Sequence, residues 1–152
     1  MDNTRTPVLY IVGNYNIDLV MGTLPHWPAQ GTEMMLEHSA LRPGGSAGNC
    51  ALAAAAMQLP HCTVGCQGDD AFTPWLAAQF PGGSARWPQY PCETSLTVAI
   101  THPNKERSFL SNHGHITRLT AGDVLDQLPA AAGEGDIVLL CGTFLCTRLL
   151  SD

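Results

Sequence analysis

An amide and a carboxylate, Asn16 and Asp18, follow the first apolar run of the chain at a spacing of two residues. The run Val8–Val12 is partly β-branched and ends at Gly13, so it predicts a buried strand. Side chains two residues apart point to the same side of an extended backbone. This pair suits hydrogen bonding to a polyol at the carboxyl end of a strand, where α/β sheets bind ligands. The alternative is a turn held by Asx hydrogen bonds without a ligand.

A glycine-rich segment, Gly44-Gly45-Ser46-Ala47-Gly48-Asn49, leads into the run Cys50–Leu59. The alanines of that run predict a helix, which Pro60 stops. Glycines at a helix start allow a ligand to approach free backbone N–H groups, and Asn49 would lie in the first turn. The segment is not a phosphate-binding P-loop, because no Gly-Lys-Ser/Thr ends it. The alternative is a glycine-rich helix start that binds nothing.

The cysteines and histidines do not follow the spacing of a metal site. Six cysteines occur, and none of them are paired as in zinc knuckles: Cys50, Cys62, Cys66, Cys92, Cys141 and Cys146. We expect small core residues, with Cys62 and Cys66 in one buried strand and Cys141 at the end of another. His113 and His115 have no carboxylate or cysteine at ligand spacing, so they predict a solvated loop. No metal ligand is assigned.

Strands and helices are expected to alternate along the chain. Strands are predicted at residues 8–12, 62–66 and 136–140, a hairpin at 95–101 and 107–111, and helices at 50–59, 70–80 (capped by Thr73) and from Thr120 to Pro129. The strands next to helices are continuous apolar runs, which is typical of a parallel sheet. We therefore predict an α/β layered fold with a parallel central sheet. Segments of about residues 22–43 and 95–111 would form a smaller β element.

Composition bounds the class of protein. The 152 residues suit one domain, and 45% hydrophobic residues provide for a core. Seven Lys and Arg residues against 13 Asp and Glu residues give a net charge of −6 without a basic run, so nucleic-acid binding is disfavoured. The longest apolar run is too short to span a bilayer. The first residues do not resemble a signal peptide, so we expect a cytoplasmic protein that binds neither membrane nor nucleic acid.

Together these motifs resemble the ribokinase-like (PfkB) carbohydrate kinase family. The resemblance rests on Asn-x-Asp after the first strand, a proline-containing excursion, and Gly-Gly-x-x-x-Asn at the start of an alanine-rich helix. Gly65–Asp70 resembles the next strand of the family with its Gly-x-Asp turn, and Thr94–Ser111 resembles part of its lid. The match covers nearly the whole chain but only the N-terminal half of the family fold. It implies a Rossmann-type layered fold with a small β lid, truncated after about half.

The resemblance implies that a hydroxyl of a sugar or nucleoside is phosphorylated by ATP with Mg²⁺. Asn16 and Asp18 would hold sugar hydroxyls. Gly44 and Gly45 would border the substrate, with Gly45 presenting its backbone, and Asn49 would add an amide contact. Ribokinase itself has a lysine where this chain has a serine, directly after the two glycines. The family also suggests a homodimer that forms through the lid.

The catalytic motif of the family, Asp-Thr-x-Gly-Ala-Gly-Asp, and its Asn-x-x-Glu motif do not occur in the sequence. Thr120–Asp123 and Gly133–Asp136 look similar, but they lack the surrounding motif or lead into a strand, so no catalytic residue is assigned. We expect the ATP and Mg²⁺ sites in the missing half. The alternatives are a non-catalytic sugar-binding or interaction module and an unrelated nucleotide-binding α/β domain.

Overall fold

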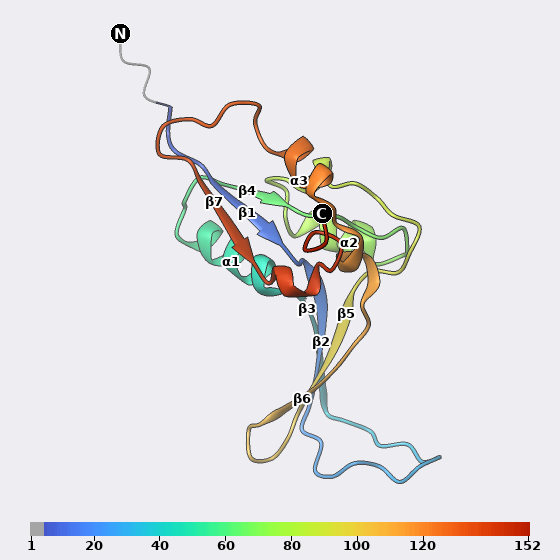
Figure 1. The fold of residues 1–152 in the computed structure, drawn as a ribbon. Coiled ribbons are helices and arrows are strands. Elements are labelled where there is room, and N and C mark those ends of the chain that lie inside the picture. The colour runs from blue at the N-terminus through green and yellow to red at the C-terminus, as the bar shows by residue number, and fades with distance from the viewer. Residues whose placement is uncertain (1–4) are drawn as a thin grey trace.

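A three-stranded parallel sheet in the order β4-β1-β7 forms the centre of the structure (Figure 1), a computed structural model that describes residues 5–152. Its strands are β1 (Leu9–Gly13), β4 (His61–Val64) and β7 (Ile137–Cys141). β1 is parallel to both neighbours. It is the most buried of the three strands, which explains why its sequence is a continuous apolar run. The predicted α/β fold with a parallel central sheet is confirmed.

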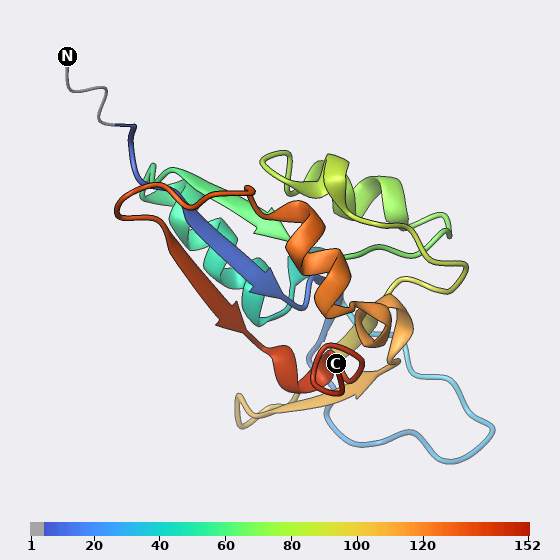
Figure 2. The ribbon, with the colours of Figure 1, turned by 45° about the horizontal axis from the view of Figure 1, so that its top comes forward.

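Helices cover both faces of this sheet (Figure 2). The packing face of the longest helix consists of Ala47, Ala51 and Ala54, which contact Ile11 and let the helix lie close to the sheet. Val124 packs against the other face. None of the helices in residues 5–152 is long and apolar enough to cross a membrane. The helices are α1 (Ser46–Ala56), α2 (Thr73–Ala78) and α3 (Ala121–Gln127), with 3₁₀ turns at Ser84–Arg86, Gly114–Arg118 and Thr143–Leu145.

The helix starts confirm one predicted cap and correct another. At α3, the Thr120 hydroxyl accepts from the Asp123 N–H, and the Asp123 carboxylate accepts from the Thr120 N–H. At α2, the predicted cap by Thr73 is wrong. The carboxylate of Asp70 instead accepts from the backbone N–H of Phe72 at 3.0 Å. A carboxylate accepts such a hydrogen bond more strongly than a threonine hydroxyl does. With Asp70 in this turn, α2 begins at Thr73, later than the predicted start at residue 70.

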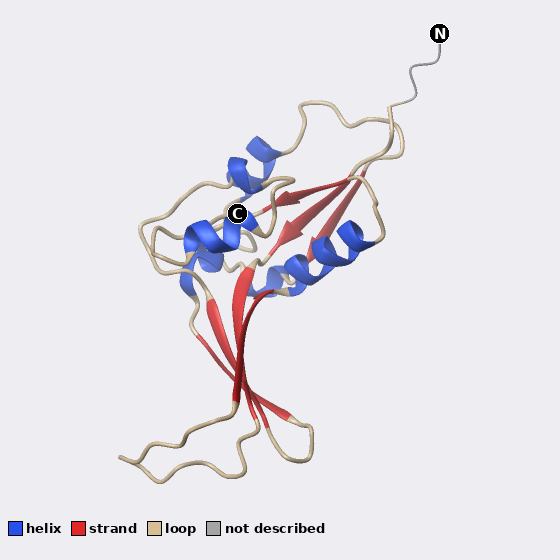
Figure 3. Ribbon diagram, turned by 180° about the vertical axis from the view of Figure 1, so that it is seen from behind, coloured by secondary structure: helices blue, strands red, loops and turns tan. Residues whose placement is uncertain are grey.

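A second sheet, here called the lid sheet, projects from the end of the central sheet (Figure 3). Its order is β3-β2-β5-β6, from β2 (Asn16–Gly22), β3 (His38–Gly44), β5 (Leu96–Thr101) and β6 (Arg107–Ser111). The hairpin of β5 and β6 was predicted. The other half differs from the expected segment 22–43, because its first strand already begins at Asn16. Residues 23–37 form no helix or strand.

The β7 strand lies at an open edge of the central sheet. Among the described residues it pairs with β1 alone, and Ile137 and Leu140 are 60% and 62% exposed. An apolar edge strand offers unpaired N–H and C=O groups to another chain. We expect the 152-residue chain to self-associate, and Leu140→Lys to reduce this association. Light scattering during size exclusion measures both, and Leu125→Lys is the control because Leu125, on α3, is also exposed, by 69%. A stable wild-type monomer would contradict the expectation.

Candidate functional site

Asn16 and Asp18 lie where the chain passes from the central sheet into the lid sheet. Only two residues, Asn14 and Tyr15, separate β1 from β2. The Asn16 side chain is buried, and its Nδ2 donates a hydrogen bond of 2.8 Å to Oδ1 of Asp18. The two side chains therefore lie on one side of β2, as their spacing predicted.

The Asp18 carboxylate is half-buried and has one oxygen available. Burial raises the pKa of this carboxyl above its usual range, and the hydrogen bond from Asn16 opposes that shift. Arg42 faces Asp18 across β2 and β3, but no ion pair joins them within residues 5–152. In that part of the chain no group donates to Oδ2. A ligand hydroxyl can therefore donate to it.

The two glycines of the β3–α1 connection press their backbone against this pair. A Cβ on Gly44 would collide with the Asp18 carboxylate, at 2.6 Å from Oδ1. A Cβ on Gly45 would lie 2.6 Å from Oδ1 of Asn16 and would also collide with the Asn14 carbonyl oxygen. Gly45 has a φ of +85°, which side-chain-bearing residues rarely adopt. Position 45 therefore requires glycine, and a side chain at position 44 would displace the Asp18 carboxylate.

Asn14 joins this glycine turn to the start of α1. Its Oδ1 accepts a hydrogen bond of 3.0 Å from the N–H of Ser46, the first residue of the helix. Gly45 has no side chain to cap α1, so the cap comes from a distant part of the chain. We did not single out Asn14 from the sequence. A signal was present, because a helix that begins after two glycines needs an acceptor from elsewhere.

The side chain of Asn49 does not bond to Asn16 or Asp18, although its backbone N–H donates to the Gly45 carbonyl oxygen at 2.8 Å. It is exposed in the first part of α1, which begins at Ser46, before the predicted start at Cys50. Within residues 5–152 its side chain makes no hydrogen bond to Asn16 or Asp18. Its predicted amide contact with a substrate remains a prediction.

A polar pocket of about 150 Å³ opens beside Asn16. Hydroxyls of the lid sheet line it: Thr97 Oγ1 lies 3.5 Å from Asn16 Nδ2, and Thr97 and Ser111 share a hydrogen bond of 2.8 Å. Amides and hydroxyls without a cation suit a neutral polyhydroxylated ligand. The whole lining is Asn14, Asn16, Ser95, Thr97, Ser111, Asn112, His113, Ile116 and Leu145.

His115 is buried behind the site, so the predicted solvated loop at His113 and His115 is wrong for this residue. Its Nδ1 accepts from the Ser95 N–H at 3.0 Å, and its Nε2 donates to the Tyr15 carbonyl oxygen at 3.0 Å. These partners select the neutral tautomer with the proton on Nε2. Burial lowers the pKa of His115 to about 4. His115 thus fixes the backbone between Asn14 and Asn16.

Protonation of His115 is expected to destabilise the fold in acid. The pKa of His115 is about 4 in the folded chain and near 6.5 when unfolded, so the unfolded chain binds the proton more tightly. Above pH 6.5 His115 is neutral in both states and the free energy of unfolding is unaffected. As the pH falls from 6.5 towards 4, the free energy of unfolding should decrease by about 3 kcal/mol. Urea unfolding at several pH values measures this slope. His115→Gln should flatten it and His113→Gln should keep it; an unchanged slope in His115→Gln would contradict the assignment.

The two acidic residues that resemble catalytic ones have structural partners. Asp123 belongs to the cap of α3 and accepts from the Tyr90 hydroxyl. Asp136 accepts from the N–H groups of Val8 and Gly133 at 2.9 and 2.8 Å and pairs with Arg5. The hydrogen bonds from Val8 and Gly133 lower the pKa of Asp136. Both carboxylates are therefore occupied by partners within the protein.

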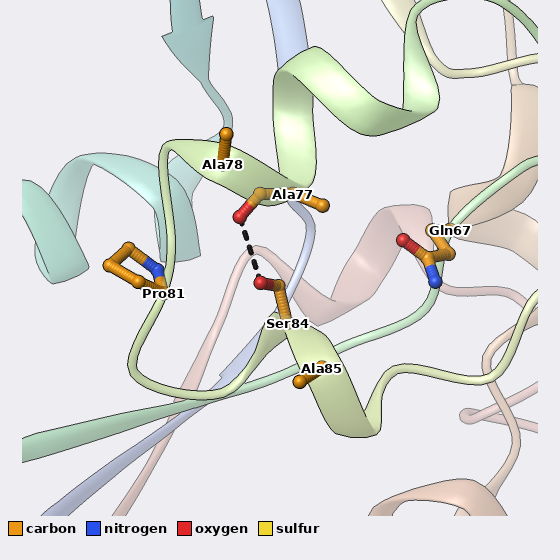
Figure 4. Close-up of a pocket in the computed structure, with 6 residues that line it drawn as sticks. All are labelled: Gln67, Ala77, Ala78, Pro81, Ser84 and Ala85. Carbon is orange, nitrogen blue, oxygen red and sulfur yellow. Dashed lines mark hydrogen bonds between the residues drawn. The ribbon is translucent and has the colours of Figure 1, made fainter.

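A larger hollow of about 470 Å³ lies away from the site (Figure 4). Its lining is mostly apolar, and the one hydroxyl in it, on Ser84, donates to the Ala77 carbonyl oxygen at 2.8 Å. Gln67 Nε2 donates to the Trp87 carbonyl oxygen. These polar groups are largely satisfied within the protein. Nor do residues 5–152 contain a group of three or more His, Cys, Asp or Glu side chains that could hold a metal ion.

Solved structures of sugar and nucleoside kinases are similar to this chain. Ribokinase from Arabidopsis thaliana, complexed with ribose and ATP, has a TM-score of 0.66 and 20% identity over 90% of this chain and 45% of that one. A nucleoside kinase of Methanocaldococcus jannaschii, from the ribokinase family, has a TM-score of 0.66 and 13% identity over 98% and 50%. Ribokinase from Giardia lamblia has a TM-score of 0.64 and 23% identity over 80% and 38%.

No protein-family model and no curated protein sequence matches the chain. The chain spans between 38 and 50% of the length of the three solved structures. At these identities the likeness establishes the fold. The chain therefore has a ribokinase-like α/β fold, over about half the length of the solved kinases that share it.

Proposed function

We propose that this chain carries the sugar-binding half of an ATP-dependent carbohydrate kinase. The observation that carries the proposal is the Asn16–Asp18 pair, with one carboxylate oxygen available and two glycine backbones against it. In this role Asn16 and Asp18 bind sugar hydroxyls, while Gly44 and Gly45 let the sugar approach the backbone. Asn49 adds an amide contact from α1 once a sugar is bound.

The chemistry proposed for these residues is positioning. Phosphoryl transfer depends mainly on holding the attacking hydroxyl in line and on stabilising charge. A carboxylate that accepts from one hydroxyl and an amide that bonds a second fix the orientation of a sugar ring. The hydroxyls of Thr97 and Ser111 lie beside Asp18 on the same face of the lid sheet and would bond further hydroxyls of the same substrate.

We propose that the catalytic base and the ATP and Mg²⁺ sites belong to residues outside these 152. The described residues do not fit those groups: Asp123 and Asp136 are engaged, and a cluster of metal ligands is lacking in residues 5–152. Among the similar structures, the Arabidopsis ribokinase contains ATP. ATP would supply the phosphoryl group in the whole enzyme. The family's catalytic motif, absent from this sequence, would supply the base.

We also propose a homodimer through the apolar face of the lid sheet. Leu19 lies opposite Leu41 and beside Val98, and Val98 lies opposite Leu110, so these side chains share one face. Leu110 is 57% exposed. Leu110→Glu should weaken a lid-mediated dimer, whereas Leu140→Lys should weaken association through β7. Size exclusion with light scattering separates the two contacts.

Two measurements on the chain test the proposed function. Calorimetry with a panel of pentoses, hexoses and nucleosides should detect binding of at least one of them, and absence of binding would refute the proposal. A coupled ADP-release assay over the same panel should show no activity. Sugar-dependent ADP release that survives repurification would show that the catalytic residues lie within this chain.

The rival function is a non-catalytic sugar-binding module, which the same pair and pocket would serve. Sequencing the gene past codon 152 separates the two. An in-frame Asp-Thr-x-Gly-Ala-Gly-Asp segment supports the kinase, and a stop codon supports the module. ATP binding without sugar would instead favour an unrelated nucleotide-binding domain.

A further inference from the structure

Two cysteines that are distant in sequence lie next to each other. The Sγ atoms of Cys50 and Cys141 are 3.5 Å apart, although the residues are separated by 91 positions. Cys50 belongs to α1, and Cys141 is the last residue of β7. Both residues are partly exposed. Sequence reasoning treated both as core residues and did not foresee the contact.

The other four cysteines have different surroundings. Cys62, Cys66 and Cys146 are buried. The Cys66 thiol donates to the His115 carbonyl oxygen at 3.2 Å. Cys92 is partly exposed. Among residues 5–152, which include all six cysteines, no other two sulfur atoms are in contact. Proximity of two accessible thiols is therefore specific to this pair.

The pair lies directly beside the turn that holds Asn14. Cys50 is four residues after Ser46 in α1, so both occupy the same side of the helix. Gly142, which follows Cys141, packs against that side: a Cβ there would lie 2.9 Å from the Ser46 Cβ and would collide with Oδ1 of Asn14. A bond between the two sulfur atoms would therefore fasten the end of β7 to the capped start of α1.

We propose that Cys50 and Cys141 are a reversible redox site, which a low-molecular-weight disulfide such as oxidised glutathione converts into an intramolecular disulfide. One thiolate attacks the oxidant, forms a mixed disulfide and releases one glutathione. The second cysteine then attacks the protein sulfur of that mixed disulfide and releases the second glutathione. The two cysteines lose two electrons and two protons, and one glutathione disulfide becomes two thiols, so the exchange balances.

The structural change required is small. An S–S bond is about 2.05 Å long, so the two sulfur atoms must approach each other by about 1.5 Å. Burial, and the neighbouring Cys50, raise the pKa of the Cys141 thiol, so little thiolate is present at neutral pH. Exchange that begins at Cys141 should therefore be slow at neutral pH. The proposal is independent of the proposed sugar-binding function.

Incubation of the folded chain with oxidised glutathione, followed by peptide mass spectrometry, tests the proposal. We expect a linked peptide pair containing Cys50 and Cys141, at a mass lower by two hydrogen atoms, and its loss on reduction. The closed loop is long, so the Tm should rise by roughly 5–15 °C. Amide exchange at Asn14 and Ser46 should also slow, because the bond clamps their turn.

Matched variants make the result specific. Cys50→Ser should abolish both the linked peptide and the rise in Tm, while Cys92→Ser should retain both. Cys141→Ala is the second variant if Cys50→Ser does not fold. Glutathione adducts without a Cys50–Cys141 link would overturn the proposal. A Cys50–Cys141 link that leaves both Tm and amide exchange unchanged would overturn the claim that the disulfide restrains the turn at Asn14 and Ser46.

Discussion

Replacing Gly45 with valine is expected to abolish sugar binding by the chain while leaving it folded. The new Cβ would collide with the Asn14 carbonyl oxygen and lie 2.6 Å from Oδ1 of Asn16. Asn16 would have to move away from Asp18, to which it now donates at 2.8 Å. A β-branched residue at a φ of +85° adds backbone strain of order 1–3 kcal/mol.

Two measurements separate the loss of sugar binding from the loss of stability that backbone strain causes. Calorimetry measures sugar binding, and urea unfolding measures the free energy of unfolding. Gly31→Val is the matched control, because Gly31 has a φ of +80° but no atom within 4 Å of its Cβ position. It should lose stability and keep sugar binding. Wild-type sugar affinity in Gly45→Val would remove this turn from the site.

The parts of the fold that could be predicted are those that local sequence determines. The apolar run Val8–Val12 gave β1, and the period of Ala47, Ala51 and Ala54 corresponds to the packing face of α1. The prediction of a solvated loop failed for His115, while His113 is exposed, because the burial of His115 depends on Ser95 and Tyr15, the latter 100 residues away. No local pattern marks a histidine whose partners are backbone groups of other segments.

In the candidate site, too, only the part that lies within one strand could be predicted from the sequence. The spacing of Asn16 and Asp18 within one strand was enough to place both side chains on one side. The hydroxyls of Thr97 and Ser111 join them only through the pairing of β2 with β5 and of β5 with β6. That register is set by tertiary structure, so sequence periodicity indicates a half-buried strand but not which residues it faces.

Replacing Asp18 with alanine is expected to weaken sugar binding by roughly 10- to 150-fold for each hydrogen bond that the carboxylate accepts. Such charge-assisted bonds contribute about 1.5–3 kcal/mol each. The variant also removes the acceptor for the Asn16 amide. In a longer polypeptide that phosphorylates sugar, kcat/KM for sugar should fall and KM for ATP should stay nearly unchanged.

Two comparisons decide whether Asp18 binds a ligand or only supports the turn. Asp18→Asn keeps the shape and the acceptor for Asn16 but removes the charge, so it should retain stability and still lose sugar affinity. Asp126→Ala, an exposed carboxylate on α3, should change neither. If Asp18→Ala reduces the free energy of unfolding as much as the free energy of sugar binding, the carboxylate stabilises the turn and does not bind a ligand.

Sugar binding by the wild-type chain should also depend on pH. Because a charged Asp18 accepts hydrogen bonds more strongly, binding should weaken as the pH falls through the raised pKa of this group, and Asp18→Asn should lack that dependence.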